Sequence, residues 1–303
     1  MGPFTLDELK KSAPGYTKWI SGVFYWDLLG RLSSDQRDQL GDVHIDVPLE
    51  MQGALDPGFV LNIASDPLSR RVVAPVRTVR WLDEYCGLIP YLEGTGSEQR
   101  TVLPLIYDAM LALPNESERP PGPFAAFKLD GSIYNDERVK DTSNKLLNSS
   151  IAFLLAHELG HIAHNHQGGL SGTRSQIQEC EADEYAFDIM AQIGINPIGL
   201  VFFFAAAAMM ECGQQTHPLS GTRVTAAAEQ LERRPRSFID RSQPNPEFWV
   251  PVVLNQARQI RDVIPLIDKT ERRAEIMRTA QYARFDQLTE LLHHSTGGLS
   301  ARP

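Results

Sequence analysis

The sequence has few cysteines and no excess of basic residues. Its three cysteines, Cys86, Cys180 and Cys212, are widely spaced and form no C-x-x-C pair. They therefore predict neither a disulfide framework nor a thiolate metal site, and they fit a reducing compartment. The 29 basic residues are outnumbered by 38 acidic ones, which gives a formal net charge of −9. This balance argues against nucleic-acid or anionic-membrane binding as the main role, so we expect a protein or small-molecule partner.

The sequence also lacks a clear membrane-spanning or signal segment. Residues 1–15 contain no apolar run of signal-peptide length. The longest uncharged run, residues 195–213, approaches membrane-spanning length, but Asn196 and Pro197 at its start and Gly213 at its end are typical of a capped helix in a soluble core. We therefore expect no membrane span and a cytoplasmic location.

The chain is long enough for one large domain or two ordinary ones, with 303 residues of which 42% are apolar. Stretches rich in proline, glycine and polar residues at 113–124 and 233–248 are typical of segment boundaries. They predict an N-terminal segment of unknown role, a catalytic core and a C-terminal helical segment, at residues 1–122, 123–235 and 236–303. Helical periodicity dominates, which predicts a mainly α protein with a small β-sheet (α+β).

Local patterns place the expected elements. Two stretches look β-like: one within residues 42–51, and one at 124–134 with a turn at Asp130 and Gly131. Helical patterns cover residues 76–92, 99–113, about 142–167, 174–193 and 197–212. The last three are expected to end at Gly168, Gly194 and Gly213.

The motif HELGH at residues 157–161 predicts a metal site. His157 and His161 are four positions apart, so on a helix they share one face, and imidazole suits zinc. Glu158 is the right residue type to take a proton from a water that the metal activates. The apolar run before the motif would bury these side chains without reason unless they were paired or metallated. The sequence thus predicts one Zn²⁺ per chain, the alternative being a helix whose histidines only pack or face solvent.

A zinc site needs a third protein ligand. The pattern H-E-x-x-H-x-x-G-x-x-H is excluded because His164 and Gln167 stand where its glycine and last histidine belong. His164 lies roughly 10 Å further along the helix than His157, so we expect it to line the cleft or support a ligand. His166 points the opposite way on a continued helix and is expected to be structural or solvated.

The next predicted helix can supply the missing ligand. A glycine-rich loop joins it to the first helix, so the two fold back antiparallel and an acid near its start can reach the histidines. Glu179 and Asp183 share its apolar face, whereas Glu181 lies on the opposite, acidic side. We predict Glu179 as the third ligand, Asp183 as the partner of a ligand histidine's other nitrogen, and Glu181 as solvated. The alternative is a solvated acidic helix face.

Over about residues 124–232 the sequence resembles the HtpX-like and CAAX-prenyl-protease type metallopeptidases, which are gluzincins. The resemblance rests on HELGH, ECEAD at 179–183, GINPIG at 194–199 and THPLSGTR at 216–223. It implies a zincin-like core in which His157, His161 and Glu179 bind zinc and Glu158 is the general base. It also implies that His217 stabilises the oxyanion and Arg223 acts at the active site, with residues 124–134 as the strand beside the cleft. Lit-type phage-exclusion peptidases carry a similar motif arrangement.

These observations predict a zinc-dependent endopeptidase acting on protein or peptide substrates. One alternative is a zinc-stabilised regulatory or binding protein without proteolytic activity, although a purely structural site is usually closed by four protein ligands and needs no base. A Lit-like peptidase acting on a single host protein and a hydrolase of non-peptide substrates are further alternatives.

Overall fold

The structure is a computed structural model that describes residues 4–51, 62–94, 122–168, 173–209, 219–240, 244–262 and 264. Within these ranges the protein is mainly helical with one three-stranded sheet, which confirms the predicted fold class. The larger of two buried apolar clusters extends from Phe4 to Ile260 and includes residues of all three predicted segments. The helical pattern at 99–113 lies outside the described residues.

The N-terminal helical elements are α1 (Leu6–Gly22), the π-helical turn η1 (Val23–Leu28), η2 (Leu29–Arg31), α2 (Ser34–Leu40) and α3 (Val76–Gly94). Capping boxes explain two of the starts: Thr5 with Glu8 begins α1, and Ser33 with Gln36 begins α2. Helix α1 packs on α3, and both contribute apolar side chains to the common core.

The sheet consists of β1 (His44–Asp46), β2 (Ala64–Asp66) and β3 (Arg71–Val73) in the order β1-β3-β2. Strand β1 pairs parallel with β3, and β2 pairs antiparallel with β3, with Ser65 opposite Val72. The strand predicted within residues 42–51 is therefore confirmed. Among the described residues β2 is an edge strand, and it contacts the long central helix α6 (Glu137–Ala163).

The β-like interpretation of residues 124–134 is wrong. This stretch forms α5 (Pro123–Ala126) and the short 3₁₀ helix η4 (Gly131–Asn135). Pro123 occupies the first turn of α5, where a missing N–H costs nothing. Asp130 accepts a hydrogen bond from the Ser132 N–H, so the Asp-Gly pair caps a helix instead of turning a hairpin.

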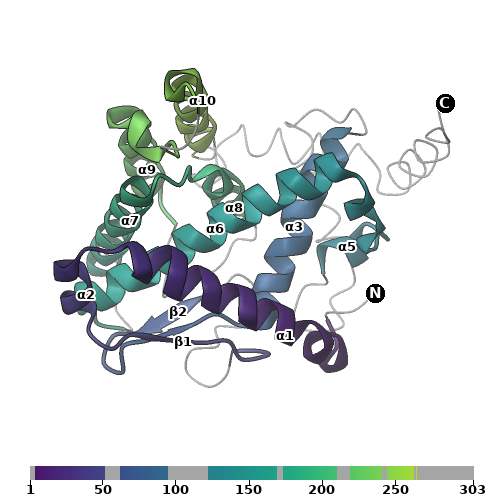
Figure 1. The fold of residues 1–303 in the computed structure, drawn as a ribbon, viewed down its shortest axis with the longest axis horizontal. Coiled ribbons are helices and arrows are strands. Elements are labelled where there is room, and N and C mark those ends of the chain that lie inside the picture. The colour runs from purple at the N-terminus through teal and green to yellow at the C-terminus, as the bar shows by residue number, and fades with distance from the viewer. Residues whose placement is uncertain are drawn as a thin grey trace.

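The remaining elements are α7 (Thr173–Ile193), α8 (Ile198–Met209), α9 (Gly221–Arg233), η5 (Pro235–Phe238), η6 (Pro246–Trp249) and α10 (Val250–Arg261). Helix α6 crosses the middle of the molecule and packs against α3, α7 and α8, while α9 and α10 lie beyond α7 and α8 (Figure 1). Every residue of α6 from Ser149 to Ile162 is buried. No helix in the described ranges is long and apolar enough to cross a membrane.

Two helix ends differ in how well they match the sequence. Helix α7 ends before Gly194, whose φ of 71° is the left-handed conformation expected there. Helix α6 ends at Ala163 instead of near Gly168, and Asn165 takes the left-handed conformation with a φ of 52°. The chain therefore leaves the helix axis before His166.

Helices α6 and α7 approach closely at Gly160, the glycine of HELGH. A Cβ atom there would lie 2.9 Å from the Cα and 3.0 Å from the carbonyl oxygen of Ala182 on α7. Only glycine leaves room for the two backbones at this distance. The contact lies between the histidines of α6 and the acids of α7, so it sets how near these groups can come.

Candidate metal centre

The structure brings the three predicted ligands together. His157, His161 and Glu179 each offer one donor atom, and these atoms lie within 4.8 Å of one another. The two Nε2 atoms are 3.0 Å apart, and the Glu179 carboxylate oxygens lie 3.3 Å from His157 Nε2 and 3.4 Å from His161 Nε2. All three side chains are buried. The antiparallel return of α7 after α6 produces this arrangement, and the ligand role itself stays a prediction.

The chemistry of this donor set fits zinc, which takes imidazole nitrogens and carboxylate oxygens. Two ring nitrogens 3.0 Å apart need a proton or a cation between them, because facing lone pairs repel. For the side chains alone, burial lowers the pKa of His157, but hydrogen bonds to Asp183 and Glu179 outweigh it and raise that pKa to about 10. Burial lowers the pKa of His161. The cluster thus favours one positive charge at the point where the donors converge.

Asp183 and Arg223 contact the predicted ligands and restrain their positions. His157 Nδ1 lies 2.8 Å from Asp183 Oδ1, which is the contact that the sequence predicted. Arg223 Nε and Nη2 donate to the two oxygens of Asp183 at 2.7 and 2.9 Å, and Arg223 Nη1 lies 2.9 Å from Glu179 Oε2. Burial alone would raise the pKa of Asp183, but Arg223 and His157 lower it. The Arg223 guanidinium therefore fixes two carboxylates at once.

Glu158 lies beside the predicted ligands on α6 and is buried. Its Oε2 accepts a hydrogen bond of 2.7 Å from the Ser65 hydroxyl on β2. The strand beside Glu158 therefore comes from the N-terminal segment and not from residues 124–134. Sequence reasoning missed Ser65, because nothing in a three-residue strand 93 positions before Glu158 indicates the contact.

His166 and Glu181 are placed differently from the sequence prediction. His166 is buried and lies with its Nδ1 2.8 Å from His161 Nδ1, because α6 ends before it and the chain turns back. Its Nε2 lies 3.0 Å from Glu181 Oε2. Burial and the neighbouring His161 lower the pKa of His166. The expectation that His166 points away from the predicted ligands is wrong. Glu181 is exposed, as expected, but it contacts His166. His164 is exposed and its ring stacks on His166.

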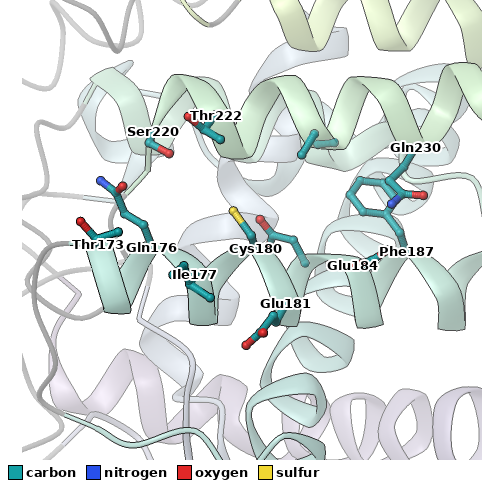
Figure 2. A pocket seen from close by; sticks show the side chains of 13 residues that line it. Thr173, Gln176, Ile177, Cys180, Glu181, Glu184, Phe187, Ser220, Thr222 and Gln230 are labelled. Carbon is teal, nitrogen blue, oxygen red and sulfur yellow. The ribbon is translucent and has the colours of Figure 1, made fainter.

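A groove of about 320 Å³ lies between α7 and α9, on the side of Asp183 (Figure 2). Ile177, Cys180 and Phe187 give it an apolar part, and Asp183 also lines it. Figure 2 shows the Cys180 sulfur turned towards α9 and the Glu181 carboxylate on the other side of α7. Glu158 is not among the described residues that line this groove.

His217, which the family resemblance suggests as an oxyanion donor, lies outside the described residues. Arg223 is described, and its guanidinium contacts Glu179 and Asp183. Its contacts are those of a positioning residue.

Comparison with known proteins relates the middle of the chain to peptidases. Residues 109–242 match the Peptidase U49 family. This match supports the resemblance to Lit-type peptidases, and the comparisons do not support the HtpX-like or CAAX-prenyl-protease resemblance. No solved structure matches the chain.

Similarity to a known metalloprotease also relates the chain to peptidases. The chain is 28% identical to "Metalloprotease LoiP" of Escherichia coli (strain K12), and the alignment covers 26% of this chain and 48% of LoiP. The chain thus spans about half the length of that relative. Together the two matches support a metallopeptidase, in agreement with the buried cluster of two histidines and a glutamate.

Proposed function

We propose that the protein is a zinc-dependent endopeptidase that hydrolyses peptide bonds of protein substrates. The observation that carries this proposal is the buried convergence of His157, His161 and Glu179, with Glu158 one residue after the first histidine. The Peptidase U49 and LoiP similarities support the same class of reaction.

His157, His161 and Glu179 would hold the zinc ion. When bound, zinc supplies Lewis-acid polarisation of the scissile carbonyl and makes a nearby water acidic enough to attack at neutral pH. Glu158 takes the proton of the attacking water and passes it to the leaving amine. Ser65 donates a hydrogen bond to one oxygen of Glu158 and so helps to orient this carboxylate.

Asp183 and Arg223 act as positioning residues. Asp183 accepts from Nδ1 of His157, so that Nε2 of this histidine is free of its proton and can bind metal. Arg223 compensates the buried charge of Asp183 and Glu179. We propose His217 as an additional donor to the developing oxyanion, on the basis of its place in THPLSGTR alone.

Strand β2, which lies at the edge of the sheet formed by the described residues, is the proposed docking strand for substrate. A peptide in extended conformation can add to the unpaired edge of a sheet through backbone hydrogen bonds. The Ser65–Glu158 contact puts β2 next to the general base, so a peptide paired along this strand passes close to Glu158. This role replaces the one expected for residues 124–134.

A digest of mixed proteins tests the proposal. Purified protein is incubated with the mixture with and without a chelator, and new peptide ends are read by mass spectrometry. We expect cleavage that the chelator abolishes and added zinc restores. Glu158→Gln should keep about one zinc per chain and lose hydrolysis, because Glu158 is not a ligand.

The outcomes separate the alternatives. Zinc that is tightly bound without any cleavage would favour the regulatory or binding protein. Cleavage of one protein at one position would favour a Lit-like peptidase with a single substrate, and equal activity of Glu158→Gln would contradict the assigned mechanism.

A further inference from the structure

Three side chains, the last of them the proposed zinc ligand His161, are connected by short polar contacts that lead inwards from the surface. Glu181 on α7 has a half-exposed side chain, and its Oε2 lies 3.0 Å from His166 Nε2. His166 is buried, and its Nδ1 lies 2.8 Å from Nδ1 of His161. His161 then presents Nε2 to His157 and Glu179.

If both imidazole rings are neutral, only one assignment of hydrogen-bond donors and acceptors fits these contacts. An ionised carboxylate only accepts hydrogen bonds, so Nε2–H of His166 donates to Glu181. A neutral imidazole carries one proton, so Nδ1 of His166 must accept, and Nδ1–H of His161 must donate to it. Nε2 of His161 is then left with its lone pair, which is the form that binds a metal ion.

The backbone supports this placement. After α6 ends at Ala163, the left-handed Asn165 reverses the chain, and the His166 N–H donates to the carbonyl oxygen of His161 at 2.9 Å. The His164 ring stacks on His166 with an interplanar angle of 17°. His166 is thus held from its own backbone and from one ring face, which fixes its Nδ1 against His161.

His166 does not join the ligand cluster itself. The groups of possible metal ligands among the described residues contain His157, His161 and Glu179, without His166. Its nitrogen meets the side of the His161 ring that faces away from the cluster. The contact is therefore one to the ligand's other nitrogen, which in metal sites sets ring orientation and tautomer.

We propose that His166 and Glu181 are positioning residues that fix the tautomer and orientation of the zinc ligand His161. The proposal rests on the proposed zinc site. It gives the acids of ECEAD one task each: Glu179 binds the metal, Asp183 holds His157 directly, and Glu181 holds His161 through His166. Figure 2 shows the Glu181 carboxylate on the side of α7 away from α9, as this task requires.

Zinc affinity of the whole chain, measured by competition with a chromophoric chelator, tests the proposal. We expect His166→Ala to lower the affinity by about 10–100-fold, as changes to such partners do. Glu181→Ala should lower it by a smaller factor, and Glu181→Gln should restore much of the loss because its amide oxygen still accepts from His166. The matched control is Glu184→Ala, an exposed acid on the same helix, which should match the wild type.

A double-mutant cycle separates action through His166 from general charge effects. If Glu181 acts through His166, Glu181→Ala should change nothing further in the His166→Ala protein. In cobalt-substituted protein, His166→Ala should also shift the visible ligand-field absorption, since it alters the orientation of one ligand. Glu181 is half-exposed, so its variants should fold even if His166→Ala does not.

The outcomes distinguish this proposal from the proposed function. Wild-type protein that binds zinc, with unchanged affinity in both His166→Ala and Glu181→Ala, overturns the positioning role alone. An equal effect of Glu181→Ala in both backgrounds also overturns it. Wild-type protein that binds no zinc overturns the proposed zinc site and this role with it.

Discussion

The helix pair α6–α7 and the strand β2 contribute to the same site in different ways. The helix pair places its ligands through buried charges, because Arg223 contacts both Glu179 and Asp183, and Asp183 contacts His157. Strand β2 contributes one hydroxyl, that of Ser65, to Glu158. In the proposed function, the first arrangement would hold the metal and the second would orient the general base. Metal binding and catalytic rate should therefore respond to different substitutions.

Substitution of Glu179 is the most direct test of metal binding by the helix pair. We expect Glu179→Gln to lose zinc on dialysis, because a zinc site needs three protein ligands and the neutral amide replaces an anionic one. Metal analysis after dialysis measures this, with Glu184→Gln as the exposed control on the same helix. Zinc retained at one per chain would remove Glu179 from the ligand set.

Substitution of Arg223 tests how much the free energy of unfolding depends on a counter-ion for the two buried carboxylates. Arg223→Met leaves two buried carboxylates without it, so we expect the free energy of unfolding to fall by about 3–5 kcal/mol. Denaturant unfolding measures the change. Arg236→Met, which removes an ion pair that is exposed on both sides, should cost at most about 1 kcal/mol. Equal losses of unfolding free energy in the two variants would contradict a stabilising role of Arg223 between Glu179 and Asp183.

Ser65 tests the separate role of β2. We expect Ser65→Ala to lower kcat by about 10–100-fold, the equivalent of one hydrogen bond to a charged group of about 1.5–3 kcal/mol. KM and zinc affinity should stay unchanged, and Ser65→Thr should recover activity because it keeps the hydroxyl. Ser69→Ala, in the same hairpin but bonded to Asp66, is the control. A loss of zinc in Ser65→Ala would show that the two regions are not separable.

Gly160 tests the spacing of the helix pair. We expect Gly160→Ala to destabilise the fold by about 1–3 kcal/mol, since the new methyl group meets the backbone of α7. Gly15→Ala is the matched substitution within α1, where a Cβ meets nothing within 4 Å. There we expect a gain of about 0.5–1 kcal/mol from helix propensity. Thermal or denaturant unfolding distinguishes the two signs.

Much of the helix pair could be predicted because its signals are local. The four-residue spacing of the histidines and the side of the second helix on which Glu179 and Asp183 lie follow from helix periodicity alone. The structure brings these residues together as that reasoning expects. The backbone approach at Gly160 adds the reason why the motif has a glycine between its histidines.

The remaining contacts depend on where a helix ends and on pairing over long distances. Asn165 ends α6 earlier than Gly168 would, and this reverses the direction of His166 and gives Glu181 a partner. Ser65 approaches Glu158 across 93 positions, which no local pattern indicates. At Asp130, one side chain fits both a hairpin turn and a helix cap, so local chemistry could not choose between them.

Arg223 follows Asp183 by 40 residues along the chain. During synthesis at about 5–20 residues per second, α7 therefore leaves the ribosome roughly 2–8 s before Arg223 can reach it. In that interval Glu179 and Asp183 have no guanidinium between them, and their repulsion disfavours the ligand geometry. We expect the nascent protein to acquire its metal only after α9 has docked, so that a chain broken off before residue 223 remains without hydrolytic capacity.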